Sequence, residues 1–256
     1  MKTLGFIGTG TITGAFIEGL VASGRRNPVL VSPRSAQRAE ALAARFETVS
    51  RAASNAEVAR DSDIVFLAMR PAQVEEALTG IDFRPGQIVC SFVTGLTVPE
   101  ISAYAPGAVV CRVLPLPAVA MGKGPIIHYP RVDAVADLLG GMGQLIVPRT
   151  ERELVAMGGV SGFMSTFFAL QAGLVSWLEG RGVAGEAAET YVRAIFSGLA
   201  ETALRSPEPL PDLVREHETK GGLNERTRKH LVSRGWVEET FAALDSVQQF
   251  SRTDLD

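Results

Sequence analysis

The glycines near the start of the chain are the first residues whose types and spacing indicate chemistry. An apolar run at 4–7 leads into Gly-Thr-Gly-Thr-Ile-Thr-Gly at 8–14, and apolar residues at helical spacing follow at once. A strand, a tight turn and a helix N-terminus in this order bind a pyrophosphate, because backbone amides point at the anion. Gly8 is expected to make the turn, and Gly10 to let the backbone approach a phosphate oxygen. The alternative is a glycine-rich turn without a ligand. The residues predicted to contact a dinucleotide here are Gly8, Thr9, Gly10, Thr11 and Ile12.

The end of the second predicted strand indicates which dinucleotide binds. Val-Leu-Val at 29–31 runs into Ser32, Pro33, Arg34 and Ser35, with no acidic residue to chelate the ribose hydroxyls of NAD. Arg34 and the two hydroxyls of Ser32 and Ser35 offer donors for a 2′-phosphate. We therefore predict NADP(H) rather than NAD, although Ser35 can equally serve as the cap of the next helix.

Two further positions lie where this fold class places its ligand. The strand at 64–68 ends in Ala68, Met69, Arg70 and Pro71, at the carboxyl edge of the predicted sheet. Arg70 is expected to reach phosphate or ribose, or else to be a solvated arginine at a helix start. Asn55 is a further candidate for the cofactor site, and its alternative is an ordinary helix N-cap.

Two segments are candidates for the substrate end. Residues 112–124 follow the sixth predicted strand, and their two prolines predict a rigid wall with few amide donors, including Leu116. Further on, a Gly-Gly pair precedes a helix, and consecutive amides at such an end can hold a carboxylate or phosphate. An ordinary helix–helix turn is the alternative reading. The predicted nest comprises Gly221, Gly222, Leu223 and Asn224.

The elements that position these residues follow a βαβ alternation over the first half of the chain. The strands are predicted at 4–7, 29–31, 48–49, 64–68, 88–92, 109–113, 126–129 and 145–147. Beyond Pro148 the sequence predicts only helices, at 154–180, 185–205, 225–234 and 237–250, with a proline-rich break at 206–211. The fold class is therefore α/β, with an N-terminal Rossmann-type doubly wound parallel sheet at 1–149 and a C-terminal all-helical dimerisation and substrate domain at 150–256.

Composition limits the other possibilities. The 256 residues carry a net charge of -3, which disfavours a nucleic-acid partner. Cys90 and Cys111 fall in predicted buried strands, so neither a disulfide framework nor a metal cluster is expected, and the chain starts without a signal-peptide pattern. We expect a cytoplasmic protein. The charge-free stretch 154–178 could span a bilayer by length, but its glycines and polar residues favour a helix buried between subunits, with no membrane contact.

The order of motifs resembles the pyrroline-5-carboxylate reductase family over almost the whole chain. Phe6 to Ile12 is similar to the family's nucleotide turn, and Ala-Met-Arg-Pro at 68–71 to its Ala-Val-Lys-Pro. Asn55 falls where the family has an asparagine near the adenosine end, residues 112–124 match its Arg-Val-Met-Pro-Asn stretch without a gap, and Ser161 matches its Leu-Ser-Gly helix start. This resemblance implies NADPH-dependent reduction of a cyclic imino acid to proline, and a homodimer, or a higher oligomer, with interlocking helical domains.

The departures from the family pattern concentrate at the substrate end. Asn-Thr-Pro becomes Leu116-Pro117-Ala118, and paired threonines become Leu223-Asn224. Loss of hydrogen-bonding side chains changes which ligand a site accepts. The alternatives to reduction of 1-pyrroline-5-carboxylate are therefore a related imine or 2-oxo acid reductase and a non-catalytic NADP-binding protein. No side chain is assigned as catalytic, because a basic cyclic imine needs no strong general acid from the protein.

Overall fold

The computed structural model describes residues 1–249, which divide into two compact units. The first unit is Met1–Gly158, and the second starts at Gly159. The division falls inside helix α7 (Glu151–Val160), which begins just after the predicted boundary between residues 149 and 150. The two units are described separately below.

The first unit is built on one sheet of eight strands in the order β3-β2-β1-β4-β5-β6-β7-β8. The strands are β1 (Leu4–Ile7), β2 (Val29–Val31), β3 (Val49–Arg51), β4 (Ile64–Leu67), β5 (Ile88–Ser91), β6 (Val109–Pro115), β7 (Pro125–Tyr129) and β8 (Gln144–Ile146). After β3 the chain returns past β1 to form β4, so the strand order reverses between β1 and β4. In doubly wound sheets, ligands bind at the carboxyl ends of the two strands that flank this reversal.

The predicted parallel sheet contains one antiparallel pair, near one edge. Strands β1 to β6 are parallel, but β7 pairs antiparallel with β6, and β8 runs parallel to β7. The connection from β6 to β7 spans only residues 116–124, which is too short for the crossover that a parallel pair requires. The Rossmann-type α/β class predicted from the sequence is otherwise confirmed.

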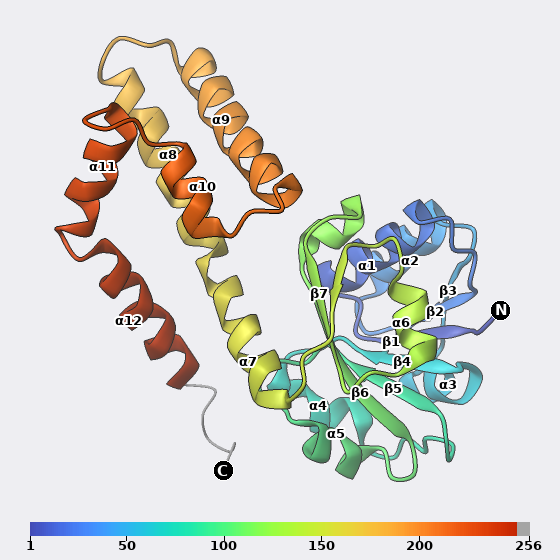
Figure 1. Cartoon of the computed structure of the whole chain (residues 1–256). Coiled ribbons are helices and arrows are strands. Elements are labelled where there is room, and N and C mark those ends of the chain that lie inside the picture. The colour runs from blue at the N-terminus through green and yellow to red at the C-terminus, as the bar shows by residue number, and fades with distance from the viewer. Residues whose placement is uncertain (250–256) are drawn as a thin grey trace. The chain divides into compact units, whose positions relative to one another are not determined.

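Helices cover both faces of this sheet, as the blue to green part of Figure 1 shows. Helices α1 (Thr11–Ala22), α2 (Ala36–Arg45) and α6 (Asp133–Leu139) contribute to one buried cluster, and α3 (Asn55–Asp61), α4 (Val74–Leu78) and α5 (Val98–Tyr104) to the other. A capping box formed by Thr97 and Glu100 opens α5. On the first face, four phenylalanine rings pack together, with Phe6 and Phe66 stacked at 4.7 Å between centroids. This packing fixes β1 against β4, the two strands whose ends flank the reversal.

The sequence predicts a single rigid loop at 112–124, and this prediction is wrong. Strand β6 continues to Pro115, and a 3₁₀ helix, η2 (Pro117–Met121), follows. Val119 in η2 is fully buried, and a Cβ on Gly19 of α1 would lie 2.4 Å from the Val119 carbonyl oxygen. The segment therefore packs directly on α1, because glycine at position 19 allows the two backbones to approach. Leu116, predicted to face substrate, caps the start of η2 and is half-buried.

Both cysteines lie in buried strands, as predicted, and both are free thiols. Cys90 in β5 and Cys111 in β6 are directly opposite each other, with 3.1 Å between their sulfur atoms. Burial raises the pKa of Cys90, whereas the hydrogen bond from Cys90 and the neighbouring His128 lower the pKa of Cys111 to about 6. The pair lies inside the sheet, with Cys90 opposite Phe66, the penultimate residue of β4.

The second unit is helical. After α7 come a 3₁₀ turn, η3 (Ser161–Phe163), and α8 (Met164–Glu179), α9 (Gly185–Arg205), α10 (Leu210–Glu216), α11 (Leu223–Val232) and α12 (Trp236–Gln249). Helix α10 was not predicted, because its prolines were interpreted as a break. Proline is tolerated in the first turn of a helix, where the amide lacks a partner anyway. The predicted end of the last helix, Phe250, lies outside the described residues.

The helices of this unit leave large apolar side chains exposed. Helix α8 contains no buried residue, and Phe168, Trp177 and Leu199 are between 46% and 66% exposed. The run 151–179 has a mean hydropathy of 1.4 over its most apolar window, so length and composition alone make it one candidate for a membrane span. A helix that is apolar on most sides must be covered by another surface.

Candidate functional site

The turn after β1 has the conformation that the glycine spacing predicts. Gly8 adopts φ +106°, and a Cβ at this position would lie 2.3 Å from the carbonyl oxygen of Ala68. The carboxyl ends of β1 and β4 are therefore in direct contact at the strand reversal. Only glycine allows both this φ and this approach. The structure thus places Gly8 and Ala68, predicted from two different motifs, at one point.

Gly10 presents an open surface at the start of α1. It is the N-cap of this helix, with φ -81° and ψ -176°, and a Cβ built on it would meet nothing within 4 Å. The first amides of a helix have no intrahelical acceptor, so the N-terminus of α1 can receive an anion. Thr13 replaces the third glycine of the usual motif, and its buried hydroxyl donates to the Gly8 carbonyl at 2.7 Å. Thr13 therefore stabilises the turn through this buried hydrogen bond.

The two glycines predict opposite results for alanine substitution. Gly8→Ala should lower the free energy of unfolding by about 1–3 kcal/mol, because alanine at positive φ is strained and would meet the Ala68 carbonyl. Gly10→Ala should leave stability unchanged, because the added methyl enters open space, yet weaken NADPH binding by about three- to tenfold if phosphate approaches there. Thermal unfolding and fluorescence titration with NADPH measure the two effects. A Gly10→Ala protein with normal affinity would exclude phosphate from this turn.

The residues after β2 divide into structural and accessible ones. Ser32 is 1% exposed, and its hydroxyl accepts the Gly8 amide at 2.9 Å. Thr9 is also buried, with its hydroxyl 3.3 Å from the Ser32 carbonyl. These two residues hold the turn in shape rather than presenting donors to solvent. Ser35 stands at the N-cap of α2, as the capping alternative has it, but its side chain makes no capping hydrogen bond.

A pocket of about 410 Å³ adjoins the accessible residues after β2. Its lining comes from the β2–α2 loop, the start of α3, and α4 with the loop that follows it: Pro33, Arg34, Ala53, Ser54, Asn55, Ala56, Glu76, Ala77, Thr79, Gly80 and Ile81. Arg34 is exposed in the pocket and forms an ion pair with Glu76, with 3.1 Å between Nη1 and Oε2. A cation at the end of β2 and an adjoining pocket fit the adenosine end of NADP.

Asn55 is not the N-cap of α3, which was the alternative role considered for it. The N-cap of α3 is Ser54, whose hydroxyl accepts the Glu57 amide at 3.1 Å. Asn55 is the first helical residue, and its side-chain amide donates to the carbonyl of Ala77 in α4 at 3.1 Å. Asn55 therefore ties together two elements that line the pocket.

The segment after β4 lies beside the glycine turn. Ala68 and Met69 are half-buried, and Ile12 of α1 packs partly into the same core cluster as Ala68. Arg70 and Pro71 are exposed at the start of a 3₁₀ helix, η1 (Pro71–Gln73), where the Arg70 amide donates to the Gln73 side chain at 3.3 Å. Of the residues predicted to contact the cofactor, Thr11, Arg34, Arg70 and Pro71 are thus the exposed ones.

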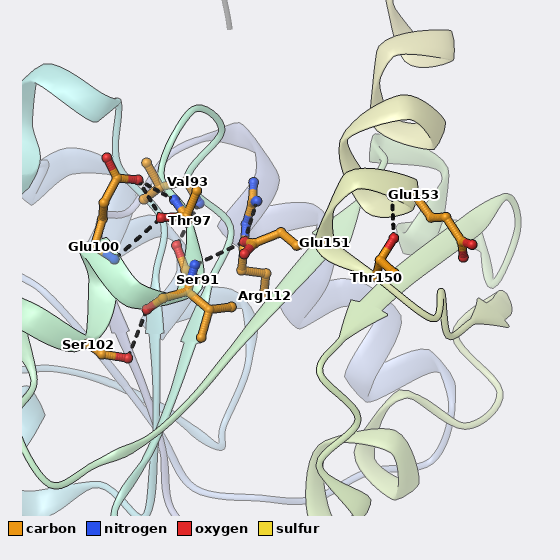
Figure 2. Close-up of polar contacts among 10 residues, drawn as sticks. Ser91, Val93, Thr97, Glu100, Ser102, Arg112, Thr150, Glu151 and Glu153 are labelled. Atoms are coloured by element: carbon orange, nitrogen blue, oxygen red, sulfur yellow. Dashed lines mark hydrogen bonds and ion pairs between the residues drawn. The ribbon is translucent and has the colours of Figure 1, made fainter. Parts of the chain in front are cut away.

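A buried ion pair near the carboxyl end of β5 was missed by the sequence analysis. Arg112 of β6 lies opposite Ser91, and its Nη1 is 2.8 Å from Oε1 of Glu151 at the start of α7 (Figure 2). The same oxygen accepts the Val98 amide at 2.9 Å. Arg112 is 3% exposed and the Glu151 side chain 15% exposed. Two residues 39 apart in sequence, on a strand and a helix, give no periodic signal that could reveal this pair.

The predicted anion nest in the second unit is partly filled from within the chain. Gly221 has φ +74°, and its amide donates to Oε2 of Glu225, the third residue of α11, at 2.6 Å. Lys229 pairs with the other oxygen, and these two contacts lower the pKa of Glu225. The Asn224 side chain donates to the His217 carbonyl at 2.8 Å, and Leu223 is 80% exposed. An ionised carboxylate therefore already stands at this helix end, which the prediction did not foresee.

Comparisons with known proteins agree with this geometry. Residues 3–95 match the family model described as NADP oxidoreductase coenzyme F420-dependent. The chain is 29% identical to a pyrroline-5-carboxylate reductase of Corynebacterium melassecola, covering 78% of this chain and 79% of that protein. It is 25% identical to the pyrroline-5-carboxylate reductase of Pseudomonas aeruginosa, covering 97% and 95%.

A solved structure shares the fold over the full length. The pyrroline carboxylate reductase of Plasmodium falciparum, solved with NADP bound, superposes with a TM-score of 0.83 at 18% identity, covering 98% of this chain and 97% of that one. The resemblance seen in the sequence motifs is thus confirmed at the level of both sequence and fold. Relatives of one name align from near one end of the chain to the other, and together with the shared fold they support membership of the chain in the pyrroline-5-carboxylate reductase family.

Proposed function

We propose that this chain is an NADPH-dependent reductase of a cyclic imine, and that its substrate is 1-pyrroline-5-carboxylate, which it reduces to proline. Members of its family are NAD(P)H-dependent oxidoreductases that act on a CH–NH group, and NADP is the cofactor of the matched domain. The single observation that supports the proposal most is the contact of Gly8 with Ala68 beside the open N-terminus of α1.

The described residues fit NADPH. The open surface at Gly10 would receive the pyrophosphate, because a Cβ there meets nothing within 4 Å. The pocket of about 410 Å³ would take the adenosine end, with Arg34 holding the 2′-phosphate. Arg70, exposed after β4, is in reach of phosphate or ribose by its place at the carboxyl edge of the sheet. When bound, NADPH supplies the hydride that an imine carbon accepts.

In this proposal the chain's own residues act mainly by positioning. A cyclic imine is basic enough to arrive protonated or to take its proton from water, so no strong general acid is required. Fixed binding of the cofactor would align the reacting carbon atoms, and alignment alone can supply a large part of a rate enhancement. The amides of Leu223 and Asn224, at the first positions of α11, would hold the substrate carboxylate.

Glu225 should modulate that carboxylate site. Its ionised side chain occupies the Gly221 amide and adds negative charge beside the α11 amides. Glu225→Gln should therefore lower KM for 1-pyrroline-5-carboxylate by about two- to fivefold, because a like charge is removed, with little change in kcat. Steady-state kinetics measure the change, and Glu216→Gln on α10 serves as a control of equal charge. An increase in KM would mean that Glu225 organises the site instead.

A second candidate function is a related imine or 2-oxo acid reductase, and a third is a non-catalytic NADP-binding protein. Two observations favour a different substrate: the apolar residues Leu116 and Leu223 where the family pattern has polar ones, and the carboxylate of Glu225 within the nest. A substrate without a carboxylate would not compete with Glu225.

One assay separates the three readings. Purified protein is mixed with NADPH and 1-pyrroline-5-carboxylate, and the loss of NADPH absorbance is followed. Oxidation supports the first reading. Absence of oxidation with this substrate but turnover with other cyclic imines or with 2-oxo acids supports the second. Tight NADPH binding without turnover on the whole panel supports the third.

We also propose a cytoplasmic homodimer, or a higher oligomer of such dimers, whose helical units cover each other. The exposed apolar side chains of α8 and α9 support a protein partner, and the glycines and serines of 151–179 favour packing against helices over contact with lipid. Light scattering on purified protein should give twice the chain mass or a multiple of it. A monomer, or co-flotation with lipid vesicles, would contradict the proposal.

A further inference from the structure

Glu76 faces Arg34 across the adenosine pocket. Glu76 belongs to the first turn of α4, and Arg34 to the loop after β2, so the pair joins two walls of the pocket. The distance from Arg34 Nη1 to Glu76 Oε2 is 3.1 Å, and the side chains are 56% and 70% exposed. Exposed ion pairs of this kind are weak, so a ligand can displace either partner.

The place of Glu76 in the pocket is fixed by its surroundings. The next residue, Ala77, accepts a hydrogen bond from the Asn55 side chain, which ties α4 to α3. Val74 and Leu78 of the same helix are buried in the core of the unit. Glu75 is also in the first turn of α4, but it does not line the pocket. The carboxylate at 76 is therefore held at the pocket, and the one at 75 is not.

The two charges have opposite preferences for the two dinucleotides. A guanidinium binds a 2′-phosphate through charge-assisted hydrogen bonds, which favours NADPH. A carboxylate beside the same ribose repels that phosphate but accepts hydrogen bonds from free ribose hydroxyls, as acidic residues do in NAD sites. The sequence lacks an acidic residue at the end of β2, but Glu76 of α4 places a carboxylate beside Arg34 in the loop that follows β2.

We propose that Glu76 is a residue that determines cofactor specificity: it competes with the 2′-phosphate for Arg34, limits the preference for NADPH and lets the pocket accept NADH. The inference rests on the proposed NADPH site, but not on the identity of the substrate. Glu76 contacts cofactor rather than reacting atoms in this account. The usual position for such a carboxylate is the end of β2, where this chain has Ser32 and Arg34.

The test measures dissociation constants for NADPH, NADH and adenosine 2′,5′-bisphosphate with the full chain, by fluorescence titration without substrate. Glu76→Gln should tighten NADPH and the bisphosphate by about three- to tenfold and weaken NADH by about twofold. Glu75→Gln removes the same charge from the same helix and should change each constant by less than about twofold. In an Arg34→Ala background, the gain from Glu76→Gln for the bisphosphate should fall to less than half.

Each outcome decides the inference. An unchanged ratio of NADPH to NADH affinity in Glu76→Gln would overturn it, and so would an equal change in Glu75→Gln. A full gain in the Arg34→Ala background would overturn competition for Arg34. Failure of the proposed function looks different: wild-type protein would bind neither dinucleotide, or would bind both and reduce no imine, whatever the charge at position 76.

Discussion

Replacing Arg34 with alanine should weaken NADPH binding by about 10- to 100-fold and change NADH binding by less than about threefold. Arg34 is the only arginine that lines the adenosine pocket in the described part of the chain, and its guanidinium is exposed toward it. Its loss removes the charge-assisted hydrogen bonds to the 2′-phosphate and leaves Glu76 to repel that group. NADH has no 2′-phosphate, so its affinity should change little. Fluorescence titration with each dinucleotide measures the difference.

Arg38 provides the matched control for this result. It is exposed on α2, four positions along the chain, and does not line the pocket. Arg38→Ala should leave both affinities within about twofold of the wild type, because an exposed charge outside the site is largely screened. Equal weakening of NADPH and NADH in Arg34→Ala would contradict the assignment of the 2′-phosphate to this residue.

Removing Glu151 should cost far more stability than any surface charge. Glu151→Ala is expected to lower the free energy of unfolding by about 3–5 kcal/mol, because it leaves the guanidinium of Arg112 buried without a counter-charge. The substitution also removes the acceptor of the Val98 amide, and Arg112 Nε already has no hydrogen-bond partner among the described residues (Figure 2). Denaturant unfolding followed by circular dichroism measures the change.

Glu153→Ala tests whether the effect is specific to burial. Glu153 is on the same helix and pairs with Arg149, whose side chain is 90% exposed. Exposed pairs contribute about 0–1 kcal/mol, so this variant should be close to the wild type. The double variant Arg112→Met, Glu151→Leu should recover much of the lost stability, because no buried charge then remains. Similar losses in Glu151→Ala and Glu153→Ala would contradict this account of the buried pair.

The fold was predictable where local signals determine it. The strand at 4–7, the glycine turn and the apolar spacing of α1 are short-range features, and the structure has all three. The direction of β7 was not predictable from its own residues, since an apolar run has no preferred direction, and only the short connection 116–124 determines it. Helix α10 was missed because proline within a helix and proline at its first turn look alike in sequence.

In the candidate site, too, residues set by local sequence could be predicted and residues set by distant partners could not. Gly8, Gly10 and Arg34 could be found because their roles depend on backbone conformation or on the place after a strand. Residues that act through partners distant in sequence could not. Glu76 lies 42 positions from Arg34, and Asn55 lies 22 positions from Ala77. Ser32 was predicted as a ligand contact, but its hydroxyl is directed to Gly8, an outcome that only the tertiary structure reveals.

Transfer of label from NADPH to product tests the central claim most directly. The protein is incubated with 1-pyrroline-5-carboxylate and NADPH that carries deuterium at C4 of the nicotinamide, and the product is analysed by mass spectrometry. The proposed function predicts proline that has gained deuterium from one or the other C4-labelled form of NADPH, in amounts equal to the NADPH consumed. Proline without label, or no proline while NADPH binds normally, would contradict it.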